Sequence, residues 1–195
     1  MEVKFREKFV EFLQSADRAV SVFFGGIDCS VIDFLMVLFS TVTEFGAAYI
    51  VLALCLFIFV KDRKQAVTVL AALLIGFLLC HILKDIFDRT RPYIELGIDI
   101  IVSPPLGSSF PSAHSATSFS VASATFLLYR KKLPILAVGT VIFAAIVAFS
   151  RIWLCVHYLS DVVVGSAVGI VTGVITVLIF GKIQDKFFMK TDRDR

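Results

Sequence analysis

The stretch AVTVLAALLIGFLLCHIL occupies residues 66–83 and contains no acidic side chain, lysine or arginine. A helix needs about 20 apolar residues to cross the hydrocarbon core of a bilayer, with a range of roughly 17–25. This stretch qualifies as a membrane span, and similar ones lie on either side of it. These further apolar stretches occupy residues 45–60, 112–129, 134–150 and, after its first turn, 158–181. The pattern predicts an all-α, polytopic membrane bundle of five or six spanning helices.

The sixth candidate span is shorter than the others. It covers residues 30–43 and carries Asp33. It can span, re-enter or lie at the interface, and the sequence leaves these alternatives open. In the last apolar stretch, small residues recur three or four positions apart, which suits close helix packing in lipid. They are Gly165, Ser166, Gly169 and Gly173.

The composition agrees with a membrane protein. Of the 195 residues, 58% are apolar and 18% are charged, against roughly 45–50% and 25% in soluble domains. The net charge of +3 is too small to indicate a polyanionic partner such as nucleic acid. Disordered chains, nucleic-acid-binding basic domains and ordinary soluble enzymes are therefore excluded. The four cysteines have no metal-ligand spacing, so we interpret them as small buried hydrophobic residues and expect no metal site and no cofactor.

The chain divides into three predicted parts. Residues 1–26 mix acidic and basic side chains and have apolar residues on one helical face, which predicts an amphipathic segment on the membrane surface. Residues 27–182 form a single membrane domain, and residues 183–195 form a charged cytoplasmic tail. The apolar residues that share the face of the first segment are Phe5, Phe9, Phe12 and Leu13.

Charge in the links between the apolar stretches predicts the orientation in the membrane. The links 61–65 and 130–132 and the end of the chain at 182–195 together hold eleven lysines and arginines, whereas the links 84–111 and 151–157 hold four. Basic links stay in the cytoplasm. We therefore expect a multi-pass protein of the cell membrane whose links 84–111 and 151–157 face outward.

Three polar strings lie at the outward ends of the predicted helices, so the topology brings them to one level of the bundle. They are KDIFDRTRP at residues 84–92, PSAH at 111–114 and SRIWLCVHYLSD at 150–161. Ionisable residues at such positions are costly unless they have partners or a function.

The cations of these strings predict an anion site. Lys84, Arg91 and Arg151 have few acidic neighbours in the sequence, and guanidinium and ammonium groups match phosphate oxygens. Ser112 begins an apolar helix, where free N–H groups and the helix dipole favour an anion. The set suits a dianionic tetrahedral group.

The histidines predict chemistry on that group. His157 and Asp161 are four positions apart, which places them on one face of a helix. A carboxylate on one ring nitrogen leaves the other nitrogen free to attack phosphorus. His114 can protonate the departing oxygen and then activate water. The predicted mechanism is a metal-independent, two-step displacement through a phosphohistidine, with the cations stabilising the transition state.

Together the three strings resemble the signature of the type-2 phosphatidic acid phosphatase superfamily, which is Lys-x6-Arg-Pro, Pro-Ser-Gly-His and Ser-Arg-x5-His-x3-Asp. The resemblance runs from Lys84 to Asp161 with matching spacings, and the flanking helices fit the integral-membrane branch. Ala113 stands where the family usually has Gly. The Cβ atom of Ala113 strains the backbone only if the φ angle of this residue is positive. The resemblance implies a phosphatase core bundle with His157 as nucleophile, His114 as acid and Asp161 as its partner. It also implies phosphate binding by Lys84, Arg91, Ser112, Ala113 and Arg151.

Taken singly, each residue also has a structural explanation. Lys84 and Arg91 can be anchors at the membrane edge, Ser112 a helix cap, and Arg151 a partner of Asp161. His81 is predicted to pack within its helix, and Trp153 and Tyr158 suit a membrane-interface belt. The link 93–110 is either a lid or a plain surface loop. The charges expected to be solvated in loops are Asp85, Asp88, Arg89, Glu95 and Asp99.

The predicted function is a membrane lipid phosphatase that acts on a lipid phosphate or diphosphate held in the bilayer. The family resemblance favours undecaprenyl diphosphate, with phosphatidylglycerophosphate and phosphatidic acid as alternatives. Alternatives of another class are a vanadium haloperoxidase-like enzyme and a non-enzymatic anion or lipid transporter. A metal site formed by the histidines and Asp161 is disfavoured, because the nearby cations repel a divalent ion.

Overall fold

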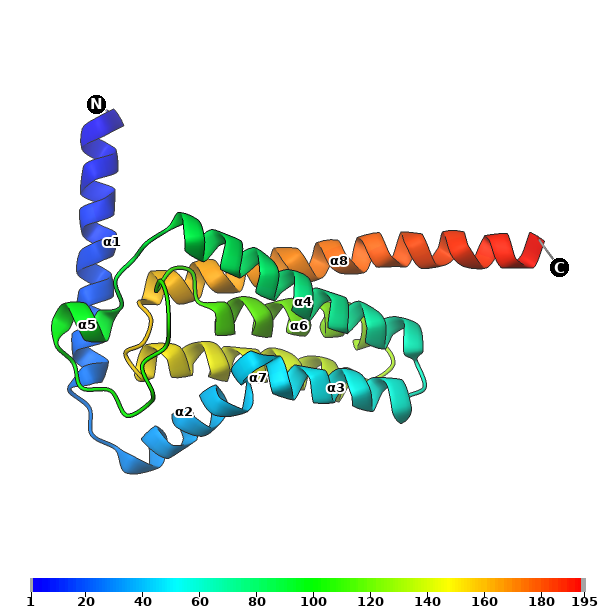
Figure 1. Ribbon diagram of the computed structural model, residues 1–195, viewed down its shortest axis with the longest axis horizontal. Helices are drawn as coiled ribbons and strands as arrows, with labels where there is room; N and C mark the ends of the chain where they lie inside the picture. The colour runs from blue at the N-terminus through cyan, green and yellow to red at the C-terminus, as the bar shows by residue number, and fades with distance from the viewer. Residues whose placement is uncertain (1, 194–195) are drawn as a thin grey trace.

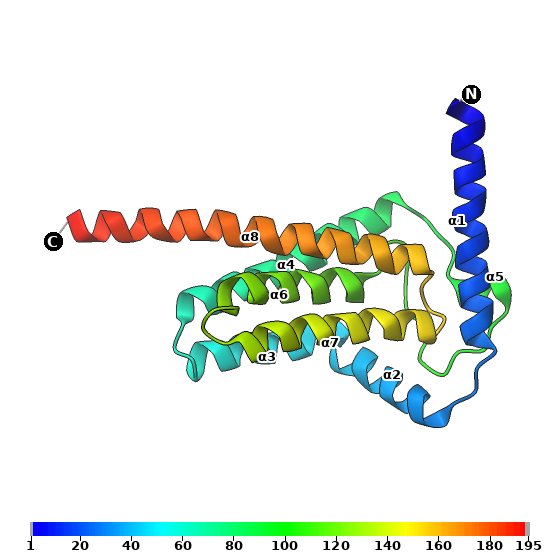
Figure 2. The same ribbon diagram turned by 180° about the vertical axis from the view of Figure 1, so that it is seen from behind.

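The computed structural model describes the backbone of residues 2–193 and, within it, the side chains of residues 6–183. Every regular element in that part is a helix, which confirms the predicted all-α class (Figures 1 and 2). The helices are α1 (Glu2–Gly25), α2 (Ser30–Val42), η1 (Glu44–Gly46), α3 (Ala47–Ile58), α4 (Arg63–Ile86), α5 (Pro92–Leu96), α6 (Ala113–Tyr129), α7 (Pro134–Trp153) and α8 (Leu159–Arg193).

Three of these helices are long and apolar enough to cross a membrane. They are Arg63–Ile86, Pro134–Trp153 and, within α8, Leu159–Ile183. Helix α6, with 17 residues, is slightly shorter and runs among them. The protein is therefore a membrane protein. Its core is built from α4, α6, α7 and α8, the helices that precede, separate and follow the three strings.

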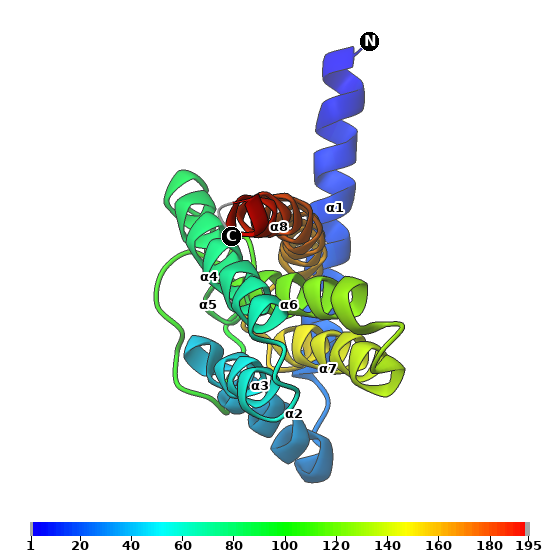
Figure 3. The same ribbon diagram turned by 90° about the vertical axis from the view of Figure 1, so that its right-hand side faces the viewer.

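Helix α6 lies at the centre of this core, with α4, α7 and α8 around it (Figure 3). Its buried side chains are mostly small or hydroxylated, so neighbouring helices come close and its hydroxyl groups find partners. Ser120 Oγ donates to the Ala72 carbonyl of α4 at 2.7 Å, and the Tyr49 hydroxyl of α3 donates to Ser118 Oγ at 2.5 Å. These contacts fix α6, whose first turn carries part of the predicted site.

Helix α8 approaches α6 through three glycines. A Cβ atom added to Gly165 would lie 2.6 Å from the Ser112 carbonyl oxygen, and one added to Gly169 or Gly173 would lie closer still to atoms of α6. No other residue type fits such a contact without displacing backbone. The small-residue packing predicted from the spacing is thus confirmed, and it sets the distance between the second and third strings.

The apolar stretches 30–43 and 45–60 form a broken pair of helices. Helix α2 has 13 residues and α3 has 12, and each is too short to cross a bilayer alone. Between them Phe45 and Gly46 have left-handed backbone, with φ of 51° and 74°. In Figure 1 α2 and α3 follow one another along the bundle. The helix expected over 45–60 is therefore shorter than predicted.

Helix α1 lies across the end of the bundle at which α2 begins (Figures 1 and 2). The chain bends by 120° between these two helices. Phe9, Phe12 and Leu13 of the predicted apolar face are exposed, while Phe5 lies outside the described side chains. This placement fits an interfacial helix, and the membrane-surface location stays a prediction.

The two ends of the bundle differ in their chemistry. The α3–α4 and α6–α7 links and the last part of α8 lie at one end, and the α4–α6 and α7–α8 links lie at the other (Figure 1). The basic links are thus at the end opposite to the three strings, as the alternation of charge predicts. The side chains of the predicted tail after residue 183 lie outside the described part.

The cysteines only partly match their prediction. All four thiols are free, and Cys80 and Cys155 are buried. Cys29 is half-buried and Cys55 is exposed on α3, so the expectation of burial is wrong for these two. Cys55 lies on an apolar helix face that is covered by no other part of the described chain, a position at which lipid can replace protein contacts.

Candidate active site

The three strings meet at one end of the bundle. This end is built from the last turns of α4 and α7, the first turns of α6 and α8, and the links beside them. All of the predicted site residues lie there. They are Lys84, Arg91, Ser112, Ala113, His114, Arg151, His157 and Asp161.

His157 and Asp161 face each other, although His157 lies in the link before α8 and not on one helix with Asp161 as their spacing predicts. Nδ1 of His157 lies 3.6 Å from Oδ2 of Asp161, and Nε2 lies 3.2 Å from Nη1 of Arg91. A guanidinium nitrogen only donates, so Nε2 accepts and Nδ1 of the neutral ring carries the proton. The unshared electron pair of Nε2 therefore points toward the cations.

Burial keeps the His157 ring neutral. The side chain is only 3% exposed. Burial lowers its pKa, the interaction with Asp161 opposes this effect, and the charges of Arg91 and Arg151 add to it, so the pKa falls to about 3. A neutral imidazole is the form that can act as a nucleophile.

The Asp161 carboxylate is fully buried and held on both oxygens. Oδ2 accepts from Ser109 Oγ at 2.5 Å and from the Tyr158 backbone N–H at 2.9 Å. Oδ1 accepts from Arg89 Nη1 at 2.6 Å. A carboxylate with this many donors stays ionised and fixed in orientation.

The cations of the first string are held by the end of the link 93–110. Lys84 Nζ donates to the Ser108 carbonyl at 2.5 Å. Arg91 donates to the carbonyls of Leu106 and Gly107, both at 3.1 Å, and to that of Ser108 at 3.3 Å. Residues 106–108 therefore lie directly against the site. A phosphate that binds Arg91 accepts from guanidinium N–H groups that otherwise donate to these carbonyls.

Two buried nitrogen atoms of the site have no hydrogen-bond partner. The described side chains include five such buried polar atoms, and Nε2 of His114 and Nε of Arg151 are two of them. His114 lies close to Arg151 and His157. Arg151 Nη1 donates to Ser40 Oγ of α2. Buried polar atoms are normally paired, so this pair marks a place for a polar ligand.

The second string begins α6. Ser112 Oγ accepts from Ser115 Oγ at 3.0 Å, and its backbone N–H donates to the Asp161 carbonyl at 3.0 Å. Ala113 opens the helix and is not among the described residues with left-handed backbone. Its Cβ therefore causes no strain, and the departure from Gly leaves the backbone geometry intact.

Arg89 corrects the sequence-based interpretation. It was expected to be a solvated loop charge, but its guanidinium pairs with both Asp161 and Asp17, at 2.6 and 2.7 Å, and lies 4.1 Å from the ring centre of Tyr158. Glu95 is exposed, as expected for a solvated charge, and it also accepts from the Tyr158 hydroxyl at 2.5 Å. The only sequence signal for Arg89 was its place between the two cations of the first string. Nothing in the sequence pointed to Asp17, which is on another helix.

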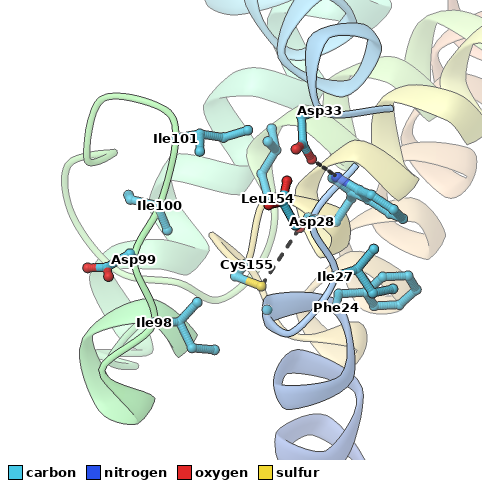
Figure 4. Close-up of a pocket in the computed structure, with 12 residues that line it drawn as sticks. Phe24, Ile27, Asp28, Asp33, Ile98, Asp99, Ile100, Ile101, Leu154 and Cys155 are labelled. Atoms are coloured by element: carbon cyan, nitrogen blue, oxygen red, sulfur yellow. Dashed lines mark hydrogen bonds between the residues drawn. The ribbon is translucent and has the colours of Figure 1, made fainter. Parts of the chain in front are cut away.

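A hollow of about 310 Å³ lies beside the site (Figure 4). It is formed by the α1–α2 junction, residues 98–101 and the end of α7, and it contains none of the predicted site residues. Its carboxylates are Asp28, Asp33 and Asp99, and Asp33 accepts from the Trp153 indole at 2.7 Å. Carboxylates repel a phosphate, so this hollow is disfavoured as a phosphate site and the cation cluster stays the predicted one. Among the described residues, no three His, Cys, Asp or Glu gather to hold a metal ion.

Known proteins resemble this chain in sequence and in architecture. The undecaprenyl-diphosphatase BcrC of Bacillus subtilis is 27% identical over 74% of this chain and 72% of its own length. A lipid A 4'-phosphatase of Bacteroides thetaiotaomicron is 30% identical over 82% of this chain and 75% of its own. The crystal structure of a PAP2 type phosphatidylglycerolphosphate phosphatase from Bacillus subtilis superposes with a TM-score of 0.73 at 24% identity, covering 87% of both chains, and shows the same fold.

The family itself covers the site. The PAP2 superfamily matches residues 65–185, which include all three strings and most of the four core helices. Because this match extends over more than half of the chain, the protein belongs to the PAP2 superfamily.

Proposed function

We propose that this membrane lipid phosphatase hydrolyses a polyprenyl diphosphate, with undecaprenyl diphosphate as its substrate, through a phosphohistidine on His157. The family and the phosphatase-named relatives support the enzyme class. The identity of the lipid and the role of each residue are the content of the proposal.

The observation that carries the proposal is the pair of unpartnered buried nitrogens, Nε2 of His114 and Nε of Arg151. Leaving buried donors unpaired costs about 1–3 kcal/mol each. A phosphate offers several acceptor oxygens and two negative charges, so it satisfies both nitrogens and balances the cations around them. A neutral or cationic ligand does neither.

In the first step Nε2 of His157 attacks phosphorus. The N–P bond forms while the P–O bond to the leaving group breaks, and His114, which is in its imidazolium form once the anionic phosphate is bound, gives its Nε2 proton to the departing oxygen and becomes neutral. The Asp161 carboxylate, 3.6 Å from Nδ1, stabilises the charge that develops on the ring, and Ser109 Oγ lies 3.5 Å from the same nitrogen. The three cations and the first turn of α6, at Ser112 and Ala113, stabilise the charge on the remaining phosphate oxygens.

In the second step water replaces the protein. His114 takes a proton from a water molecule that attacks the phosphohistidine, the N–P bond breaks, and inorganic phosphate leaves. His157 returns to its neutral form. Every proton and bond in this cycle is accounted for by the two histidines, the lipid and one water molecule.

A lipid is the substrate class that fits the position of the site. The site lies at the end of a membrane bundle, where a phosphate can reach it while its tail stays in the bilayer. The relative from Bacillus subtilis is named for undecaprenyl diphosphate, which supports that lipid. The basic links at the opposite end support a cell-membrane location with the site on the extracytoplasmic side.

Lipid A is the second candidate substrate. The lipid A 4'-phosphatase of Bacteroides thetaiotaomicron matches a larger share of this chain, at a slightly higher identity, than the undecaprenyl-diphosphatase does. Both substrates present a phosphate at the membrane surface, so the cation cluster serves either. The apolar surface that receives the tail has to distinguish them.

The test is phosphate release by the detergent-solubilised protein in excess EDTA. Four lipids are compared in mixed micelles: undecaprenyl diphosphate, lipid A, phosphatidylglycerophosphate and phosphatidic acid. His157→Ala removes the proposed nucleophile. His81→Ala is the matched control, because His81 is an exposed histidine that bonds only within α4, to the Phe77 carbonyl.

We expect the highest kcat/KM with undecaprenyl diphosphate, loss of release in His157→Ala, and full activity in His81→Ala. Preferential release from another lipid replaces the substrate and keeps the mechanism. Retained function in His157→Ala contradicts the mechanism and favours a transporter, and an EDTA-sensitive activity contradicts metal independence. Oxidation of halide with vanadate, in place of inhibition by vanadate, favours a haloperoxidase.

A further inference from the structure

Helix α1 contributes a buried carboxylate to the catalytic end of the bundle. Asp17 is 3% exposed, although most of its helix is exposed. Its Oδ1 accepts from the Ser160 backbone N–H at 2.9 Å, and its Oδ2 accepts from Ser160 Oγ at 2.5 Å. Ser160 is in the first turn of α8, so a residue of α1 caps the helix that carries Asp161.

The same carboxylate holds Arg89. Asp17 Oδ2 accepts from Arg89 Nη2 at 2.7 Å, while Arg89 Nη1 donates to Asp161 Oδ1 at 2.6 Å. Burial alone lowers the pKa of Arg89, but the hydrogen bond to Asp17 and the charge of Asp161 raise it overall. The Arg89 backbone is also fixed, because its carbonyl accepts from the Ser109 N–H at 2.8 Å. Arg89 is therefore a fixed bridge between two carboxylates.

The bridge determines how Asp161 faces His157. The two oxygens of Asp161 have different tasks: Oδ2 faces His157 Nδ1, and Oδ1 is bonded by Arg89. If Arg89 shifts, Oδ1 loses its side-chain donor and the carboxylate can rotate about its Cβ–Cγ bond. A misplacement of about 1 Å at a catalytic group can reduce a rate by about 100-fold.

We propose that Asp17 is a positioning residue for the phosphatase reaction, acting through Arg89 on the Asp161 carboxylate that orients His157. This inference rests on the proposed roles of His157 and Asp161. It makes α1 a working part of the site in addition to a segment at the membrane surface. Arg89 lies within the first string but is not one of its predicted site residues, and Asp17 lies outside all three strings, so the site extends to a helix that the strings do not include.

The alternative is that Asp17 only anchors α1. Other contacts already serve that purpose: Phe24 packs against the rings of Phe149 and Trp153, with centroids 5.6 and 5.5 Å apart, and Arg18 pairs with Glu95 at 2.6 Å. An anchor acts on stability, whereas a positioning residue acts on the chemical step. The two explanations therefore differ in what a conservative substitution changes.

Asp17→Asn is the informative substitution. Asparagine has the same shape and its carbonyl oxygen still accepts from the Ser160 N–H, but the charge that holds Arg89 is lost. We expect kcat to fall by about 10- to 100-fold, with KM and inhibition by inorganic phosphate changed by less than about twofold. Arg89→Gln should lose at least as much. Because Asp17 acts through Arg89, the double variant should be no slower than Arg89→Gln alone.

The variants are assayed as full-length protein with undecaprenyl diphosphate and with phosphatidic acid, alongside thermal unfolding to verify the fold. Arg18→Gln is the matched control, because it removes the neighbouring ion pair of α1 without touching Arg89 or Asp161. A kcat for Asp17→Asn within about twofold of the unsubstituted chain overturns the inference, and so does a double variant whose losses multiply. Activity that survives His157→Ala contradicts the proposed function instead, which keeps the two failures distinct.

Discussion

At the scale of single residues, the predicted site contains two kinds of buried side chain. Some have their hydrogen-bond partners in place, and others carry a nitrogen atom that has no hydrogen-bond partner. His157 has a donor on one side and a carboxylate on the other, so its neutral tautomer is set. His114 and Arg151 have unpartnered nitrogens. The residue types and spacings in the strings were enough to predict this set. The bridge through Arg89 was not predictable, since its partner Asp17 is on a helix that the sequence does not place next to it.

A pH dependence follows from His157 at this scale. The unfolded chain has an ordinary histidine pKa of 6.5 at this position, and the folded chain has one of about 3. As the pH falls below 6.5, the unfolded state takes up a proton that the folded state does not, so stability is lost toward acid. Between about pH 7 and pH 5 we expect this residue to account for a loss of about 2 kcal/mol. Thermal unfolding of the detergent-solubilised protein and of His157→Gln measures it: the variant should lose less stability over that interval, and equal losses contradict the assignment.

Ala113→Gly tests the one departure from the family signature. Ala113 has helical backbone, so glycine gains no conformational advantage there. We expect kcat/KM within about twofold of the unsubstituted chain and a stability lower by about 0.5–1 kcal/mol. A large gain in activity would show that the Cβ atom interferes with phosphate binding.

At the scale of elements, a sequence pattern indicates which residues share a helix face, but not which atoms of two helices come into contact. The glycine spacing in α8 correctly predicted close packing, because a repeat of three or four places small residues on one face. The boundary at Glu44 between the stretches 30–43 and 45–60 was predicted, but the left-handed backbone of Phe45 and Gly46 was not, since hydropathy carries no information on φ. The same limit applies to α1, whose amphipathic pattern indicates a surface but not the buried contact of Asp17.

Gly169→Ala is the element-scale prediction. The added Cβ lies against the Ala116 carbonyl at a separation that real Cβ atoms do not show, so α6 and α8 have to separate. We expect destabilisation by about 1–3 kcal/mol and loss of activity, because the first turns of both helices carry the site. Gly139→Ala is the matched control, since Gly139 of α7 has open space around its Cα. Thermal unfolding of both variants measures this effect. The midpoint of Gly169→Ala should be the lower one, and equal midpoints contradict the packing argument.

At the scale of the whole molecule, the fold places the basic links at one end of the bundle and the three strings at the other (Figure 1). The count of lysines and arginines was enough to predict this alternation, because each helix reverses the side of the next link. The path of residues 30–43 could not be predicted, since their length and Asp33 fit several placements equally well.

Cysteine labelling tests the orientation. Ser103 is exposed in the link beside the site, and Lys131 is exposed in a link at the opposite end. In intact cells, Ser103→Cys should react with a membrane-impermeant maleimide and Lys131→Cys should react only after the cells are opened. The unsubstituted chain gives the background of the native cysteines. The reverse pattern places the site on the cytoplasmic side.

The most direct test of the account is the trapping of the covalent intermediate. The purified protein is mixed with undecaprenyl diphosphate in excess EDTA, quenched in alkali, which preserves phosphohistidine, and digested for mass spectrometry. The account predicts a phosphoryl group on the peptide that contains His157 in the unsubstituted protein and no phosphoryl group there in His157→Ala, which cannot form the N–P bond. Phosphate release with the label on another residue, or with no labelled peptide in the unsubstituted protein, would contradict it.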